Sequence, residues 1–154
     1  MSIKVSIVPV TPYQQNCSLL KCEETGRGAL FDPGGDRERI LAAVEQLGVE
    51  LEKIILTHAH MDHCALAGEL REELGLPIEG PARGDDFWLE KLPEWCKMAG
   101  FPRAEAFEPD RWLEDGDRVT VGAQELEVLH CPGHTPGHVV LFHRGQRLAW
   151  VGDV

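Results

Sequence analysis

The chain has 154 residues, a length that suits one globular domain spanning 1–154. Its 26 acidic residues outnumber the 15 basic ones and give a formal net charge of −11, which argues against a nucleic-acid partner and an anionic membrane surface. No apolar run approaches the roughly 18 residues of a transmembrane helix. The start of the chain shows no signal-peptide pattern, and five cysteines without a CxxC pair favour reduced thiols in a cytoplasmic protein.

The first predicted elements are short strands. Ile3, Val5 and Ile7 alternate with polar residues, which indicates a half-buried strand with these three side chains on one face. Three further apolar runs predict strands at 17–21, 28–31 and 53–56. A turn at 32–35 closes the second of these strands.

Two helices are predicted between and after these strands. Apolar residues at helical spacing define a helix that ends at Gly48: Ile40, Val44 and Leu47. A second helix starts near residues 57–63 and ends at Gly75, with the apolar residues Leu66, Leu70 and Leu74.

The second half of the chain is mainly β in character. Residues 82–99 look helical, with an interruption at Pro93. Four strands then follow: 118–121, 125–130, 138–143 and 147–151. Helices that connect strands in the first half, and strands alone in the second, predict an α/β fold without a second set of helices.

The strongest functional signal follows the strand 53–56. His58, His60, Asp62 and His63 lie within six residues, and His58 and His60 point the same way if the chain is extended there. Imidazole nitrogens and a carboxylate suit zinc or iron. A solvent-exposed polar loop is the alternative, but it would explain a single histidine better than this cluster.

Two weaker signals follow two of the later strands. Residues 131–138 (CPGHTPGH) form a Pro/Gly-rich loop that would hold His134 at the same sheet edge, although an ordinary hairpin with incidental histidines is equally compatible. Asp153 follows the strand 147–151, as Asp32 follows the strand 28–31.

Together these pieces resemble the metallo-β-lactamase superfamily. The matching segments are 57–63 (THAHMDH), 132–138 (PGHTPGH) and 151–153 (VGD), while 14–20 (QQNCSLL) and 30–36 (LFDPGGD) resemble the glyoxalase II-like thioesterase branch. The resemblance implies an αββα four-layer sandwich and a two-metal site. It implies a first ion held by His58, His60 and His134, a second held by Asp62 and His63, and Asp153 bridging both.

The resemblance also implies the roles of other residues. Asp32 would orient a histidine from outside the ligand set, and His138 would be structural. His130 and His143 have no counterpart role and are expected to be ordinary strand residues. Cys64 and Cys131 adjoin the ligands, yet small buried hydrophobic roles are expected for both.

The implied chemistry is hydrolysis of a small-molecule thioester such as S-lactoylglutathione. Water shared by two ions would form hydroxide near neutral pH and attack the carbonyl, with Asp62, His63 and Asp153 as catalytic residues. Zinc is the expected metal, with iron or manganese possible from the same ligands.

The family pattern continues beyond Asp153 with further strands, helices and a last metal-binding histidine. The 154 residues are therefore expected to be about two-thirds of the domain. Residues 139–142 (VVLF) look apolar on both faces, so self-association through exposed strands is expected.

Other functions compete with the thioesterase. An iron-dependent persulfide dioxygenase with one His-His-Asp iron site belongs to the same superfamily. A β-lactamase is disfavoured by the missing signal peptide, and an RNA-cleaving relative by the net charge of −11. A non-catalytic metal-binding or assembly module remains a hypothesis of a different class.

Overall fold

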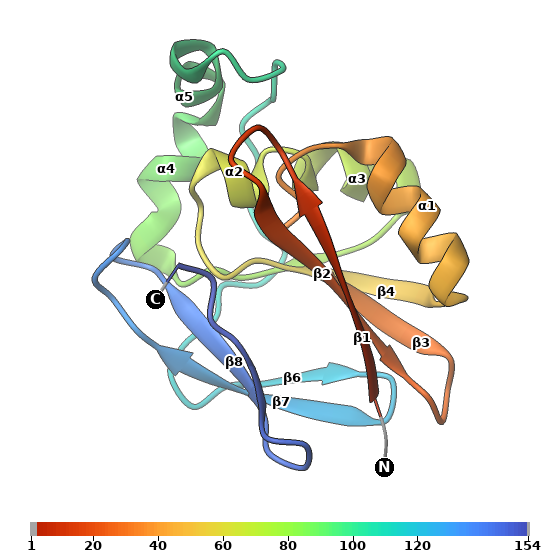
Figure 1. The fold of residues 1–154 in the computed structure, drawn as a ribbon. Coiled ribbons are helices and arrows are strands. Elements are labelled where there is room, and N and C mark those ends of the chain that lie inside the picture. Colours follow the sequence, from red (N-terminus) through yellow and green to blue (C-terminus); the bar gives the residue numbers. More distant parts are fainter. Residues whose placement is uncertain (1–2, 154) are drawn as a thin grey trace.

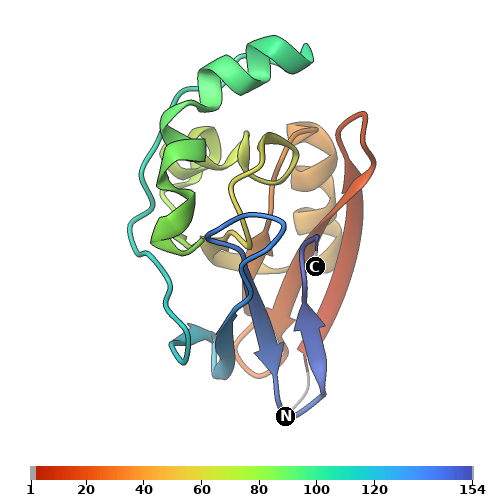
Figure 2. The ribbon, with the colours of Figure 1, turned by 90° about the vertical axis from the view of Figure 1, so that its left-hand side faces the viewer.

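Two β-sheets lie against each other, and the helices gather on the outer side of the first sheet (Figure 1). The computed structural model describes residues 3–153. The expected αββα sandwich has a fourth, helical layer on the outer side of the second sheet. Within residues 3–153, Figures 1 and 2 show no helix there. The described residues therefore form three of the four layers.

The first sheet has five strands in the order of the sequence. Its strands are β1 (Ile3–Val10), β2 (Gln15–Cys22), β3 (Arg27–Phe31), β4 (Glu50–Ile55) and β5 (Ile78–Glu79). The first three strands pair antiparallel, whereas β3, β4 and β5 are parallel. The parallel pairs need helical crossovers, which are α1 (Arg37–Leu47) and the pair α2 (Met61–Cys64) and α3 (Ala67–Leu74).

The second sheet is an antiparallel meander. It contains β6 (Arg118–Val121), β7 (Gln124–His130), β8 (Val139–His143) and β9 (Leu148–Trp150). All four strands were expected from the sequence, and no bound differs by more than one residue. In β8, Val139, Val140 and Leu141 are buried, so this strand is less exposed than its apolar sequence suggested. Self-association through it stays a prediction.

The helices differ from the sequence prediction in two places. The expected single helix before Gly75 is two, because the hydrogen bonding is interrupted at Leu66, whose N–H donates to Pro33 O at 3.0 Å. The interrupted helix of 82–99 is a short 3₁₀ turn, η1 (Arg83–Asp85), followed by α4 (Asp86–Glu90) and α5 (Leu92–Ala99). Pro93 lies in the first turn of α5, where a missing N–H costs nothing, so it begins a helix instead of breaking one.

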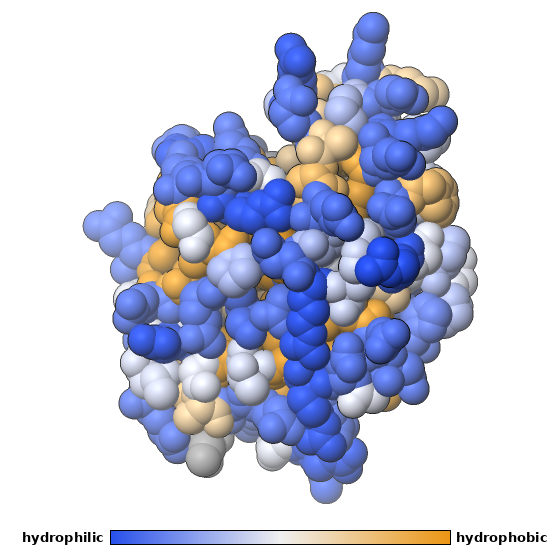
Figure 3. Space-filling model, turned by 180° about the vertical axis from the view of Figure 1, so that it is seen from behind, coloured by the Kyte–Doolittle hydropathy of each residue, from blue (hydrophilic) through white to orange (hydrophobic). Residues whose placement is uncertain are grey.

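Two apolar cores occupy the spaces between the layers. One lies between the helices and the first sheet and includes Ile40, Ile54 and Leu70; the other lies between the sheets and includes Phe31 and Leu141. Seen from behind, the surface is largely hydrophilic, with apolar side chains visible between polar ones (Figure 3). None of the helices of residues 3–153 has the length and apolarity to cross a bilayer.

The predicted burial of β1 is partly wrong. The strand forms, but Val5 is 40% exposed and Ile7 59% exposed, while Val8 and Val10 further along are buried. β1 is the edge strand of its sheet, and Val5 and Ile7 line an open groove that reaches β9. Alternation predicted the two faces of this strand, but the neighbouring layers decide which face is covered.

Candidate metal centre

All six predicted ligands come together at one edge of the two sheets. His58 and His60 follow β4, Asp62 and His63 lie in α2, His134 lies between β7 and β8, and Asp153 follows β9. Because β3 and β4 are parallel, the segments after them leave the sheet at the same edge, and there Asp32 meets the loop after β4. The fold therefore places three separate segments of the chain around one point.

The first group of side chains joins the loop after β4 to the loop before β8. His60 Nδ1 lies 3.0 Å from His134 Nε2, and Asp153 Oδ2 lies 3.0 Å from the same His134 nitrogen. His58 Nε2 is 3.4 Å from Asp153 Oδ2. One atom from each of these four residues lies within 4.8 Å of the others, which is close enough for a single ion to bind them all.

The second group contains Asp62, His63 and Asp153, whose donor atoms also lie within 4.8 Å of one another. His63 Nε2 is 3.2 Å from Asp153 Oδ1 and 3.7 Å from Asp62 Oδ2. The two oxygens of Asp153 thus face different groups: Oδ2 faces His58 and His134, and Oδ1 faces His63. A carboxylate in this position has the geometry to bridge two ions.

Asp32 orients two of the histidines through one buried network. Its Oδ2 lies 3.0 Å from His63 Nδ1 and accepts a hydrogen bond from the Thr57 hydroxyl at 2.6 Å, while the Thr57 N–H donates to Oδ1. Since the Thr57 hydroxyl has given its only proton to Asp32, it accepts from His58 Nδ1, 3.0 Å away. In the neutral rings, both Nε2 lone pairs are then directed into the centre.

The histidines of the centre have perturbed pKa values. Burial, together with the neighbouring histidines, lowers the pKa of His58 far below its ordinary range, so its ring stays neutral. Burial lowers the pKa of His60, and the nearby His134 ring lowers it further. For His63 burial again opposes the charged ring, but the hydrogen bond and negative charge of Asp32 outweigh it and raise the pKa to about 9.

The donor set fits a metal ion. His58 Nε2 and His63 Nε2 are buried and make no hydrogen bond to other described residues, although both are close to Asp153. His60 Nδ1 and His134 Nε2 lie 3.0 Å apart, where one must be the donor and the other the acceptor, and His134 Nε2 also lies 3.0 Å from Asp153 Oδ2. Buried polar atoms normally have partners, and a cation at this point would satisfy all four nitrogens.

Asp85 is a site residue that the sequence did not reveal. This fully buried carboxylate accepts hydrogen bonds from Ala59 N at 2.9 Å, Thr135 Oγ1 at 2.8 Å and Gly137 N at 2.7 Å. It therefore ties the loop that carries His58 and His60 to the loop that carries His134. No local pattern marks it, because it lies in a segment that reads only as an interrupted helix.

His138 and Gly152 position the Asp153 carboxylate. The His138 ring stacks on His58 with centroids 4.6 Å apart, and its Nε2 accepts a hydrogen bond from Asp153 N at 3.1 Å. Gly152 has φ +56°, and a Cβ there would lie 2.6 Å from both His138 Nε2 and Thr57 Oγ1. Only glycine allows this close approach without a shift.

The remaining histidines lie outside the centre. His130 Nε2 contacts Pro136 O at 2.9 Å, and buried His143 contacts Gln124 Oε1 at 2.8 Å. Cys64 is fully buried, and burial raises the pKa of its thiol, which fits the expected hydrophobic role. Cys131 is only half-buried, so it fits that role less well.

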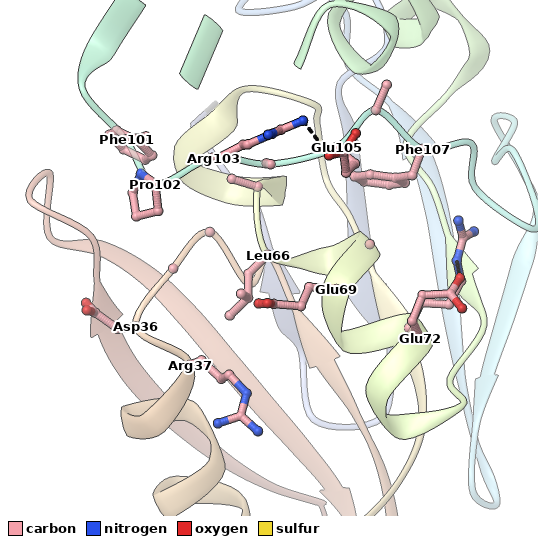
Figure 4. Close-up of a pocket in the computed structure, with 17 residues that line it drawn as sticks. Asp36, Arg37, Leu66, Glu69, Glu72, Phe101, Pro102, Arg103, Glu105 and Phe107 are labelled. Carbon is pink, nitrogen blue, oxygen red and sulfur yellow. Dashed lines mark ion pairs between the residues drawn. The ribbon is translucent and has the colours of Figure 1, made fainter. Parts of the chain in front are cut away.

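A pocket of about 630 Å³ lies away from the six ligands. It is bounded by the loop before α1, by α3 and by the segment 101–107 (Figure 4). Both arginines at its two ends have partners: Arg103 pairs with Glu105 at 3.3 Å, and Arg37 with Glu73 at 2.6 Å. Two smaller pockets of about 420 and 390 Å³ reach the candidate metal centre, one beside His63 and one beside His60.

Comparison with known proteins identifies the family. A family model described as the metallo-beta-lactamase superfamily matches residues 10–154. The hydroxyacylglutathione hydrolase GloC of Haemophilus influenzae is 40% identical over 153 residues, which cover 99% of this chain and 72% of that protein.

Solved structures agree on the fold. TTHA1623 in a di-iron-bound form is 32% identical with a TM-score of 0.85, over 97% of this chain and 72% of that one. The B3 metallo-β-lactamase BLEG-1 is 27% identical with a TM-score of 0.84, over 96% of this chain and 71% of that one. The expected fold is confirmed: the chain belongs to the metallo-β-lactamase superfamily, whose fold binds metal ions.

Proposed function

We propose that this protein is a metal-dependent thioesterase that hydrolyses a small-molecule thioester of the S-lactoylglutathione type. The observation that carries the proposal is the position of Asp153 between two groups of ligands, with one oxygen toward His134 and the other toward His63. The 40% identity to a hydroxyacylglutathione hydrolase supports the substrate class. The six proposed ligands are His58, His60, Asp62, His63, His134 and Asp153.

In this proposal Asp32 and Thr57 orient the ligand histidines. Bound cations supply Lewis acidity, which brings the pKa of water toward neutrality and stabilises negative charge on a carbonyl oxygen. Asp32 accepts the Nδ1 proton of His63, so the Nε2 lone pair of His63 stays available to bind a cation. Thr57 does the same for His58 Nδ1. Neither a serine nor a cysteine nucleophile is needed, and the thiol of Cys64, the residue after His63, is buried with a raised pKa.

Zinc is the metal we propose, because histidine nitrogens and carboxylates in an open site suit it well. The di-iron form of TTHA1623, at 32% identity, makes iron the main competitor, and manganese accepts the same ligands. We propose a cytoplasmic location, which the five scattered cysteines without a CxxC pair support.

The test combines metal analysis with two assays on the purified protein. We expect two ions per chain and release of free thiol from S-lactoylglutathione, detected with a thiol reagent. One iron per chain, together with oxygen consumption on a glutathione persulfide and no thioester cleavage, would favour the dioxygenase. Stoichiometric metal without either activity would leave a metal-binding module.

A further inference from the structure

A cluster of apolar side chains is exposed beside the candidate metal centre. Met98 is 78% exposed and Phe87 44% exposed, although large apolar side chains are usually covered. Trp88 and Trp95 lie between them, with the two indole rings 5.0 Å apart. These residues come from α4 and α5, two short helices that also form one wall of a pocket of about 390 Å³.

Two residues of the metal centre line this pocket. His60 and Asp62, both proposed ligands, line it together with Trp88, Trp95 and Met98. The Trp88 ring meets the His60 ring edge-on, with centroids 4.6 Å apart at 87°. A group bound here would therefore lie next to an atom held at the centre. The volume is within the range of small-molecule sites, roughly 300–1,000 Å³.

The lining of the pocket indicates which half of a thioester it accepts. It contains no cationic side chain, its one charged side chain is the Asp62 carboxylate, and most of its other lining residues are apolar. A thiol half such as glutathione, with its amide groups, would find few hydrogen-bonding partners there. The other pocket at the centre, beside His63, also contains carboxylates, those of Asp32 and Asp153, but it offers neutral hydrogen-bonding groups as well, among them Gln14, Asn16 and Ser18.

We propose that the pocket formed by His60, Trp88, Trp95 and Met98 binds the acyl half of the thioester, and that the protein prefers aromatic or bulky apolar acyl groups over small polar ones. The proposal rests on the thioesterase function proposed above. The indole rings supply flat apolar surface for stacking, and the flexible Met98 side chain adapts to the outer part of the group. The polar thiol half then extends toward the pocket beside His63.

The test compares two substrates that differ only in the acyl group, S-lactoylglutathione and S-mandeloylglutathione. The metal-loaded protein is expected to show a higher kcat/KM for the mandeloyl thioester. Trp95→Ala should lower kcat/KM about tenfold more for the mandeloyl thioester than for the lactoyl thioester, because the phenyl ring loses more contact area than a methyl group does. Met98→Ala, at a 78% exposed position, should act in the same direction.

Leu74→Ala is the matched control, since Leu74 is a 38% exposed apolar residue at the end of α3 that does not line the pocket. Equal kcat/KM values for both substrates in the unmodified protein, or equal losses on both in Trp95→Ala, would overturn the proposal while leaving the thioesterase intact. Failure to cleave either substrate would instead overturn the thioesterase.

A binding measurement tests whether the acyl group binds in this pocket, independently of turnover. Mandelate should quench the indole fluorescence of the protein far more than lactate does, and Trp95→Ala should weaken mandelate binding about tenfold. Quenching that is equal for both acids, or unchanged affinity in Trp95→Ala, would overturn the assignment of this pocket even if thioesters are cleaved.

Discussion

The carboxylate of Asp85 accepts a hydrogen bond from the hydroxyl of Thr135, 50 residues further along the chain, at 2.8 Å. The same Oδ2 also accepts from Ala59 N, and Oδ1 accepts from Gly137 N. One buried side chain thus sets the distance between two loops that carry three of the proposed ligands. The metal centre depends on this link even though Asp85 is not itself within the ligand groups.

Asp85→Asn should therefore weaken metal binding without removing a ligand. The amide NH₂ would face a donor where an oxygen accepts now, leaving at least one buried N–H without a partner at a cost of about 1–3 kcal/mol. We expect a lower Tm and a metal affinity reduced about 10–100-fold, measured by titration against a chromogenic chelator. Unchanged affinity in a folded variant would contradict the link.

Substitution of a proposed ligand should have a sharper effect. His60→Ala and Asp62→Ala should each lower metal content and abolish thioester hydrolysis, because a site with open coordination positions tolerates little ligand loss. Metal content is read by elemental analysis after gel filtration. The matched control is His143→Ala, which should keep full metal content but lower stability by about 1–2 kcal/mol, since the buried contact with Gln124 is lost. Full metal content in both ligand variants would refute the assignment.

The pair of Asp32 and His63 predicts a pH dependence. The folded-state pKa of His63, about 9, lies above the ordinary value of 6.5, so the pair stabilises the metal-stripped chain fully below pH 6.5 and loses this contribution as the pH rises through 9. We expect the Tm of the chelator-treated protein to fall across that window. Asp32→Asn should flatten the fall, because it removes the charge that raises the pKa. An equally steep fall in both proteins would show that His63 is not responsible.

The same pair affects metal binding in the opposite direction. A cation at His63 Nε2 must displace a proton, so affinity should rise between pH 6.5 and 9 and binding should release protons. Calorimetric titrations in two buffers of different ionisation enthalpy measure this release. Pairs of titrations that give identical heats would contradict it.

Gly34→Ala should disturb the second group of ligands from a distance. A Cβ at this position would lie 1.7 Å from the backbone oxygen of Asp62, so α2 would have to move. We expect loss of about one ion per chain, because only the Asp62 and His63 group is displaced directly. Gly75→Ala is the control for backbone strain away from the ligands: nothing lies within 4 Å of a Cβ there, but its φ of +67° disfavours alanine, so stability should fall while both ions are kept. Two retained ions in Gly34→Ala would argue against this coupling.

Much of the fold could be predicted from sequence because its elements are short and locally marked. Gly48 and Gly75 end helices α1 and α3 as expected, and the strands of the second sheet follow their alternating pattern. The exposure of Val5 and Ile7 could not be predicted, because alternation defines two faces and only the packing of a neighbouring layer selects the buried one. Pro93 likewise reads as a break until its place in a first helical turn is known.

The sequence by itself determined the donor types and their grouping, since His58, His60, Asp62 and His63 occupy one short motif whose spacing is a local property. Only the tertiary structure decided that the two oxygens of Asp153 face different groups, that Asp85 joins the loops, and that Trp88 stands against His60. These relationships join residues between 19 and 95 positions apart or depend on where two helices pack. Hydrogen bonds and ring contacts act over a few ångströms, so the path of the chain in space establishes them and no local pattern does.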